Sequence, residues 1–163
     1  MTVSGLRFPV QIFVTELREI RPKMFTRVAD VRQFLLEHPV NPTTLGPYLY
    51  WDVEHYTRNP IDKTPFYELL AICWEVGQGS AVHNHRGQNC WMAVPIGRLL
   101  VQNYRVLHQN VSTQSCDIAK SDIVEMNATN SLAVNPEEPV HKVFNPRHFN
   151  ARAVSLHLLC AAV

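Results

Sequence analysis

The pattern of apolar and polar positions separates a helical first third of the chain from a strand-rich remainder. Apolar residues recur at helical spacing behind Asp30, whose side chain suits an N-cap, and Pro39 ends this helix. Residues 45–51 predict a second short helix. Residues 8–24 fit a strand and a helical face about equally well, whereas residues 56–65 are rich in turn formers. We therefore expect a small N-terminal helical cap.

Beyond residue 66 the chain changes to short apolar segments separated by Gly, Asn, Pro and Ser. The expected strands are residues 67–75, 81–85, 91–95, 99–107, 123–126, 132–134, 140–144 and 153–159. Many short strands without helices between them are typical of an antiparallel sandwich or barrel. The pattern therefore predicts a mainly β protein, in which a barrel over residues 66–160 follows a cap over about residues 1–60.

The composition fits a single globular domain over residues 1–163. Hydrophobic residues make up 46% and charged residues 18% of the chain, which is ordinary for a folded protein and wrong for a disordered one. The net charge is +1 and no basic block is present, so nothing indicates a nucleic-acid partner. The oligomeric state is not readable from the sequence.

The N-terminal stretch and the cysteines indicate the compartment. Charged residues interrupt the apolar N-terminal positions, so no signal peptide is recognisable, and no apolar run is long enough to span a bilayer. The cysteines lie far apart and form no CxxC motif, so we expect free thiols: Cys73, Cys90, Cys116 and Cys160. These features predict a cytoplasmic protein without a membrane partner.

Two histidines one residue apart, His83 and His85, carry the first indication of chemistry. Residues two apart on a strand point to the same face, so both imidazoles can aim at one point. Imidazole suits iron, zinc, copper and nickel, so the pair predicts two ligands of a metal site. His141 is the best candidate for a third ligand because it lies on an expected strand. Other histidines fit surface positions better: His38, His55, His108 and His148.

A second polar pair lies on the last expected strand. The alternation of residues 153–159 places Ser155 and His157 on the face opposite the leucines at 156 and 158. Both side chains would then look into the barrel, where buried polar groups need partners. Two interpretations remain: a pair that orients groups bound near the metal, or an ordinary core histidine with satisfied hydrogen bonds.

Six segments, in this order along the chain, resemble the cysteine dioxygenases, which are thiol dioxygenases of the cupin superfamily. The segments are YTRN, ICW, HNH, the pair Cys90 and Gly97, HKVFN and SLHL. The resemblance covers roughly residues 28–160. The resemblance implies a cupin-type antiparallel β-barrel, or jelly roll, and a mononuclear Fe(II) site with three histidines. It further implies oxidation of a thiol to a sulfinate with O2.

The resemblance assigns His83, His85 and His141 as the iron ligands. No acidic residue lies between residues 85 and 97, so the usual cupin glutamate ligand is missing. Three neutral ligands would leave the charge of Fe(II) available to a substrate thiolate, which is a good ligand for such metals.

The resemblance also implies substrate-binding residues. Arg58 matches an arginine that holds the substrate carboxylate, and a guanidinium can do so through two parallel hydrogen bonds. Relatives that act on 3-mercaptopropionate carry glutamine at this position, so Arg58 favours cysteine. Tyr56 matches a tyrosine near the substrate, and Trp74 matches an aromatic residue of the ICW strand. Without the resemblance, Arg58 would be interpreted as a surface residue.

Cys90 matches a cysteine that many members of the family link to a tyrosine through a thioether. The family run is Ser-x-His-x-Tyr, but here Leu159 stands where the tyrosine would be. We therefore expect no cross-link at Cys90 and no tyrosine hydroxyl at this point of the site. Ser155 and His157, the other two members of the run, remain.

Three functions follow from these observations. The first is an Fe(II)- and O2-dependent dioxygenase that oxidises L-cysteine, or a close small amino-thiol, to the sulfinate. In it, His157 would be oriented by Ser155 and would position or protonate the oxygenated substrate. The second, suggested by Leu159, is a cysteine-oxidising enzyme of a specialised biosynthetic pathway that gives another product. The third is a metal- and thiol-binding cupin without turnover, against which the complete histidine set argues.

Overall fold

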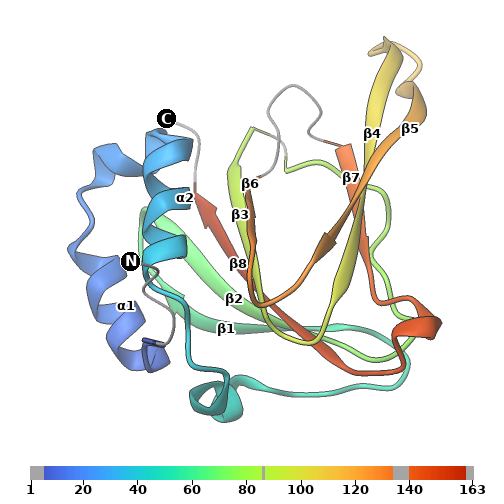
Figure 1. Ribbon diagram of the computed structural model, residues 1–163. Helices are drawn as coiled ribbons and strands as arrows, with labels where there is room; N and C mark the ends of the chain where they lie inside the picture. Colours follow the sequence, from blue (N-terminus) through green and yellow to red (C-terminus); the bar gives the residue numbers. More distant parts are fainter. Residues whose placement is uncertain (1–5, 86, 134–139, 161–163) are drawn as a thin grey trace.

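The computed structural model describes residues 6–85, 87–133 and 140–160. Two antiparallel sheets face each other, and the N-terminal helices cover the outside of one of them (Figure 1). The elements in chain order are α1 (Val10–Glu19), the 3-10 helix η1 (Pro22–Thr26), α2 (Val28–Glu37), the 3-10 helix η2 (Pro42–Tyr48), β1 (Thr57–Lys63), β2 (Tyr67–Trp74), β3 (Asn89–Ile96), β4 (Leu99–Asn110), β5 (Ser115–Met126), β6 (Ser131–Ala133), β7 (Val140–Phe144), the 3-10 helix η3 (Arg147–Phe149) and β8 (Ala153–Cys160).

The strands form two separate sheets, ordered β1-β2-β8-β3-β6 and β5-β4-β7. This arrangement confirms the expected mainly β jelly roll. The barrel is not closed, however, because no strand pairing joins the two sheets among the described residues. Strands β4 and β5 continue as a two-stranded ribbon beyond the body of the molecule (Figure 1), since β7 pairs with β4 only over residues 100–104.

The five-stranded sheet buries both of its faces, which explains why its central strands are apolar at nearly every position. In β2, Leu69 and Ala71 face the helices, whereas Leu70 and Ile72 face the three-stranded sheet. Strand β8 pairs with β2 along its whole length and alternates in the same way. Each fully buried large side chain contributes roughly 1.5–3 kcal/mol. The functional side chains lie on the face turned toward the second sheet.

The helical cap is held to the sheet by apolar contacts and by one buried carboxylate. Phe13 and Leu17 of α1 are buried in the helix-facing core. The carboxylate of Asp62 accepts hydrogen bonds from Arg18 Nε at 3.0 Å and from the Tyr67 hydroxyl at 2.5 Å. The Arg18 guanidinium, together with this hydroxyl, lowers the pKa of Asp62. The carboxylate therefore joins α1, β1 and the start of β2.

Several local predictions need correction. Residues 57–63 form β1 where turns were expected; β1 is an edge strand with an irregularity at Pro60, a position that tolerates proline. Residues 81–85 are not a strand and make only an isolated bridge. Asp30 lies in the first turn of α2 and is not its N-cap.

Other predictions are refined. The ambiguous residues 8–24 contain α1 and η1, and the second short helix is η2, which Asn41 caps by accepting from the Thr43 N–H at 3.1 Å. Strand β5 begins eight residues before the predicted start at 123. Residue 134, the end of an expected strand, lies outside the described residues. Within the described part of the chain, no helix has the length and apolarity needed to cross a membrane.

Candidate metal centre

The segment between β2 and β3 lies along β7 and brings two histidines to a third. The His83 N–H donates to the His141 carbonyl at 3.0 Å, and the His141 N–H returns a bond to His83 at 2.9 Å. Nearer the start of the segment, the Ser80 N–H donates to the Val143 carbonyl at 2.8 Å. At Gly79 a Cβ atom would lie 2.8 Å from the Phe144 Cβ, so only glycine allows this close approach.

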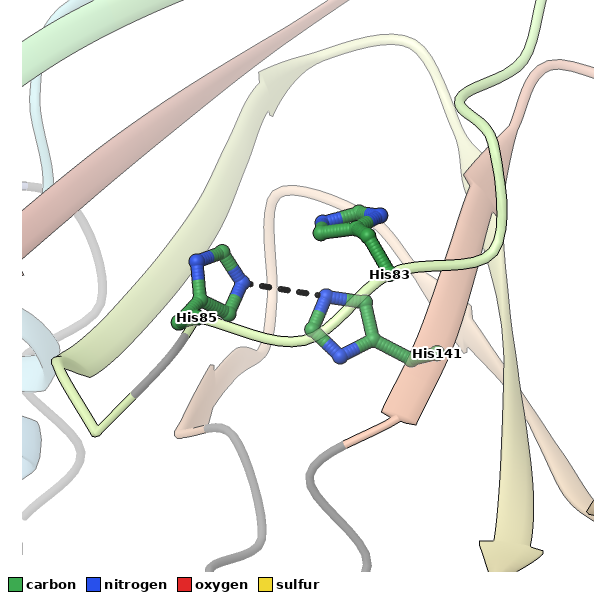
Figure 2. Close-up of side chains that lie close together, drawn as sticks. All are labelled: His83, His85 and His141. Atoms are coloured by element: carbon green, nitrogen blue, oxygen red, sulfur yellow. Dashed lines mark hydrogen bonds between the residues drawn. The ribbon is translucent and has the colours of Figure 1, made fainter. Parts of the chain in front are cut away.

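His83, His85 and His141 form one cluster (Figure 2). Their ligand nitrogens all lie within 4.8 Å of one another, and the Nε2 atoms of His85 and His141 are 3.3 Å apart. That separation is compatible with two nitrogens that share one ion at about 2.1 Å each. The His83 Nδ1–H donates to the Ala81 carbonyl at 2.8 Å, which leaves Nε2 for a metal.

The environment of His85 favours the protonation state that a metal ligand requires. Burial lowers the pKa of His85 to about 4, with further lowering by the charges of His83 and Arg58. The neutral imidazole is the form that binds a metal. The metal-binding group found among the described residues contains histidines alone. The donor set therefore fits a divalent first-row ion and adds no negative charge to it.

Arg58 lies on the same inner face of the five-stranded sheet. It is paired with Ile72 of β2, and residues opposite each other in an antiparallel pair point to the same side. Its charge contributes to lowering the pKa of His85 and of His157. The ring of Tyr56 stacks on that of Trp74, with centroids 4.5 Å apart. Arg58 therefore lies near His85 and His157, and Tyr56 lies against Trp74.

Trp74, Ser155 and His157 form a buried hydrogen-bonded chain. The Trp74 indole N–H donates to Ser155 Oγ at 2.8 Å, and this oxygen lies 2.8 Å from His157 Nε2. The Trp74 N–H uses one lone pair of Ser155 Oγ, so the Ser155 O–H can donate to His157 Nε2 in the tautomer that carries its proton on Nδ1. Burial lowers the pKa of His157 to about 3, so the ring stays neutral.

Cys90 and Leu159 are direct neighbours across β3 and β8. Cys90 is buried, and burial raises the pKa of its thiol to about 12. Leu159 packs against the core between the two sheets. The side chain opposite Cys90 therefore carries no hydroxyl group, and Cys90 is a free thiol.

The groups that position the histidines could not be identified from the sequence. The Ala81 carbonyl that orients His83 is a backbone atom, which no residue type reveals. Gly79, one of the glycines between the expected strands, lacks the Cβ that would contact Phe144 of β7. The Ser80 hydroxyl accepts from the Val143 N–H at 3.0 Å, a contact that depends on the tertiary fold.

Comparisons with known proteins agree with this site. A family model described as cysteine dioxygenase type I matches residues 3–162. Cysteine dioxygenase type 1 of Rattus norvegicus is 28% identical over 132 residues, which cover 80% of this chain and 64% of the relative. The protein of the same name from Danio rerio is 26% identical over 147 residues, with 89% and 71% covered. The chain thus spans slightly less than two thirds of the rat relative.

Solved structures agree in fold. A cupin superfamily protein from Desulfitobacterium hafniense DCB-2 has a TM-score of 0.51 and 10% identity, and the match covers 74% of this chain and 91% of that protein. KdgF from Halomonas sp. has a TM-score of 0.50 and 13% identity, with 71% and 89% covered. At these identities the likeness shows the cupin fold alone.

Proposed function

Because the chain belongs to the cysteine dioxygenase type I family, we propose that it is an Fe(II)- and O2-dependent thiol dioxygenase. Its substrate is L-cysteine, or a close small amino-thiol, and its product is the sulfinate. The observation that carries the proposal is the convergence of three imidazoles beside the charge of Arg58. The cytoplasmic location and the lack of a nucleic-acid or membrane partner stay predictions.

His83, His85 and His141 hold the iron in this proposal. Bound there, Fe(II) would supply a site for the substrate thiolate and for O2. The protein contributes a neutral donor set, and it contributes His83 already oriented by the Ala81 carbonyl. An ion held by neutral ligands keeps its full charge for an anionic substrate.

Arg58 binds the substrate carboxylate. A guanidinium can form two parallel hydrogen bonds to a carboxylate, which fixes the orientation of the substrate as well as its affinity. A hydrogen bond to a charged group contributes about 1.5–3 kcal/mol. The stacked rings of Tyr56 and Trp74 form a rigid wall beside this position. The reacting sulfur is thereby held at one place relative to the histidines.

His157 acts as a neutral hydrogen-bond donor. In this role the Ser155 O–H donates to its Nε2, so the neutral ring carries its proton on Nδ1. Since its pKa is lowered to about 3, the ring remains uncharged at neutral pH. It can therefore donate from Nδ1 to an oxygen atom of the product as charge develops there, without adding a positive charge to the site.

Leu159 supports a second candidate on the same scaffold, an enzyme that oxidises cysteine with O2 but forms another product. A leucine opposite Cys90 supplies no hydroxyl to hold the substrate or oxygen. A cupin that binds metal and thiol without turnover fits less well, because all three histidines are present.

Aerobic incubation of the Fe(II)-loaded protein with L-cysteine separates these candidates. We expect O2 uptake with cysteine sulfinate as the product, measured with an oxygen electrode and by mass spectrometry. Uptake with another product would favour the second candidate, and no uptake would favour the third. The His141→Ala variant is the control; it should retain no iron and consume no O2. Iron bound at full occupancy in this variant would contradict the ligand assignment.

A further inference from the structure

A cavity of about 590 Å³ lies on the opposite side of the five-stranded sheet, between that sheet and the helical cap. Leu156 and Leu158 of β8 line it and belong to the helix-facing core. Ser155 and His157, which alternate with them, belong to the metal-centre side. The cavity and the histidine cluster therefore lie on opposite faces of the same strand, and the proposed dioxygenase reaction does not use the cavity.

The floor of the cavity is apolar. Leu69, Trp91, Leu156 and Leu158 each have at most 5% of their surface exposed. The only polar atom of the Trp91 ring is already used, because its indole N–H donates to the Val28 carbonyl at 3.0 Å. A cavity of this volume with apolar walls has the size and character of a small-molecule site.

The rim of the cavity carries the positive charge of Arg7. Arg7 is exposed there, and among the described residues it makes no ion pair and no acidic residue lines the cavity. His38 also lines the rim and stacks on Phe34, with ring centroids 4.1 Å apart. Its Nδ1–H donates to the Phe34 carbonyl at 2.9 Å, which holds the ring in place. The guanidinium of Arg7 therefore favours an anion over a cation at this rim.

We propose that this cavity binds a small amphipathic carboxylic acid. Its aliphatic or aromatic body lies on the floor formed by β3 and β8, under α2. Its carboxylate lies at the rim and accepts two parallel hydrogen bonds from the guanidinium of Arg7. The site does not depend on the proposed function, because it requires neither iron nor the inner face of the sheet.

Decanoate and decan-1-ol, measured by isothermal titration calorimetry, test the proposal. They share an aliphatic chain and differ in charge. We expect one decanoate site per chain, and in Arg7→Gln an affinity for decanoate lower by about tenfold with little change for decan-1-ol. Arg21→Gln, at an exposed arginine that does not line the cavity, should bind both as the wild type does. Absence of decanoate binding, or equal binding by Arg7→Gln, would overturn the proposal.

Two further variants locate the bound molecule. Ala93→Phe places a large side chain in the cavity from β3 and should abolish binding of both probes. Thr129→Trp narrows the mouth of the cavity from the exposed turn before β6. It provides the same test if Ala93→Phe does not fold. Unchanged affinity in a folded variant would place the ligand elsewhere. His83→Ala should bind decanoate normally, whatever its dioxygenase activity. Loss of decanoate binding in His83→Ala would place the ligand at the metal centre and reject the cavity.

Discussion

Arg58 places a permanent positive charge beside His85 and His157, on the inner face of an edge strand. If this charge binds the substrate carboxylate, its removal should affect only substrates that carry one. We expect Arg58→Gln to lower kcat/KM for L-cysteine by about 10- to 100-fold, which corresponds to roughly 1.5–3 kcal/mol. Cysteamine, which lacks the carboxylate, should change little. The kcat/KM of Arg58→Lys for L-cysteine should lie between those of the wild type and Arg58→Gln, because an ammonium group keeps the charge but not the planar pair of donors. Equal losses for both substrates would contradict this role.

Leu159 lies directly opposite Cys90, so a tyrosine at this position would face the thiol across two paired strands. Side chains opposite each other in an antiparallel pair have Cβ atoms about 4.5–5.5 Å apart, within reach of an aromatic ring. We expect iron-loaded Leu159→Tyr, after turnover in air, to show an intact mass lower by two hydrogen atoms than calculated. The wild type and the Cys90→Ala, Leu159→Tyr double variant should show no deficit. A deficit mapped to Cys90 in the wild type would mean that another tyrosine reaches it.

At the residue scale the sequence predicted the members of the candidate site better than the way they are placed. His83, His85 and His141 do converge, but the first two do so from a loop, not from a strand. Strand alternation, which predicted the cluster, therefore does not explain it. Backbone hydrogen bonds to β7, which join residues far apart in sequence, place the segment, and the Ala81 carbonyl orients the His83 ring.

The segment between β2 and β3 keeps its place along β7 because Gly79 has no side chain. In Gly79→Ala the new Cβ would lie 2.8 Å from the Phe144 Cβ, so the segment must move away from β7. Such overpacking costs about 1–3 kcal/mol. It would weaken the backbone hydrogen bonds with β7 that position His83. We expect the affinity for Fe(II), measured by anaerobic competition with a chelator, to fall by about tenfold.

Gly46→Ala is the matched control, since a Cβ at Gly46 would meet no atom within 4 Å. Its Fe(II) affinity should equal that of the wild type. His141→Ala gives the Fe(II) affinity expected when one metal-binding histidine is removed. Wild-type affinity in Gly79→Ala would show that the close approach to β7 does not position His83.

Asp62 links the helical cap to the sheet, and its contribution depends on pH. Arg18 holds its pKa below the unfolded value of about 3.9, so the stabilisation is complete above about pH 5 and is lost as the pH falls toward the folded pKa. We expect Asp62→Asn to lower the free energy of unfolding by about 2 kcal/mol at pH 7, measured by urea titration. The difference from the wild type should shrink between about pH 5 and pH 3.

Asp117→Asn, at an exposed position, serves as the control and should change stability by less than about 0.5 kcal/mol at either pH. A difference between Asp62→Asn and the wild type that stays constant with pH would show that the charge of Asp62 is not the stabilising feature.

Among the strands, the sequence predicted those whose apolar residues are buried. It missed strands that are exposed or polar and form because they pair with a neighbouring strand. β2 is apolar on both faces, β8 is apolar except at Ser155 and His157, and both were predicted nearly to their ends. β1 was not predicted, because proline and polar residues fill it and its structure depends on pairing with β2. The start of β5 was missed for a related reason: it is exposed in the ribbon and pairs only with β4.

At the scale of the whole molecule, the two sheets meet at the histidine cluster. His83 and His85 come from the connection between two strands of the five-stranded sheet, and His141 comes from the three-stranded sheet. The sequence predicted the helical cap from apolar residues at helical spacing. It predicted the β layers from the many short strands and from the family resemblance. It did not predict that the layers remain separate sheets, since hydrogen bonding between strands leaves no trace in the residue pattern.

The proposed dioxygenase activity requires that both oxygen atoms of O2 enter the product. The Fe(II)-loaded protein is mixed with L-cysteine under isotopically labelled O2, and the product is analysed by mass spectrometry. We expect cysteine sulfinate with both sulfinate oxygens labelled, formed in proportion to the O2 consumed, and none with His141→Ala. A product without the label, a product other than the sulfinate, or no O2 consumption would contradict the assignment of this chain as a cysteine dioxygenase.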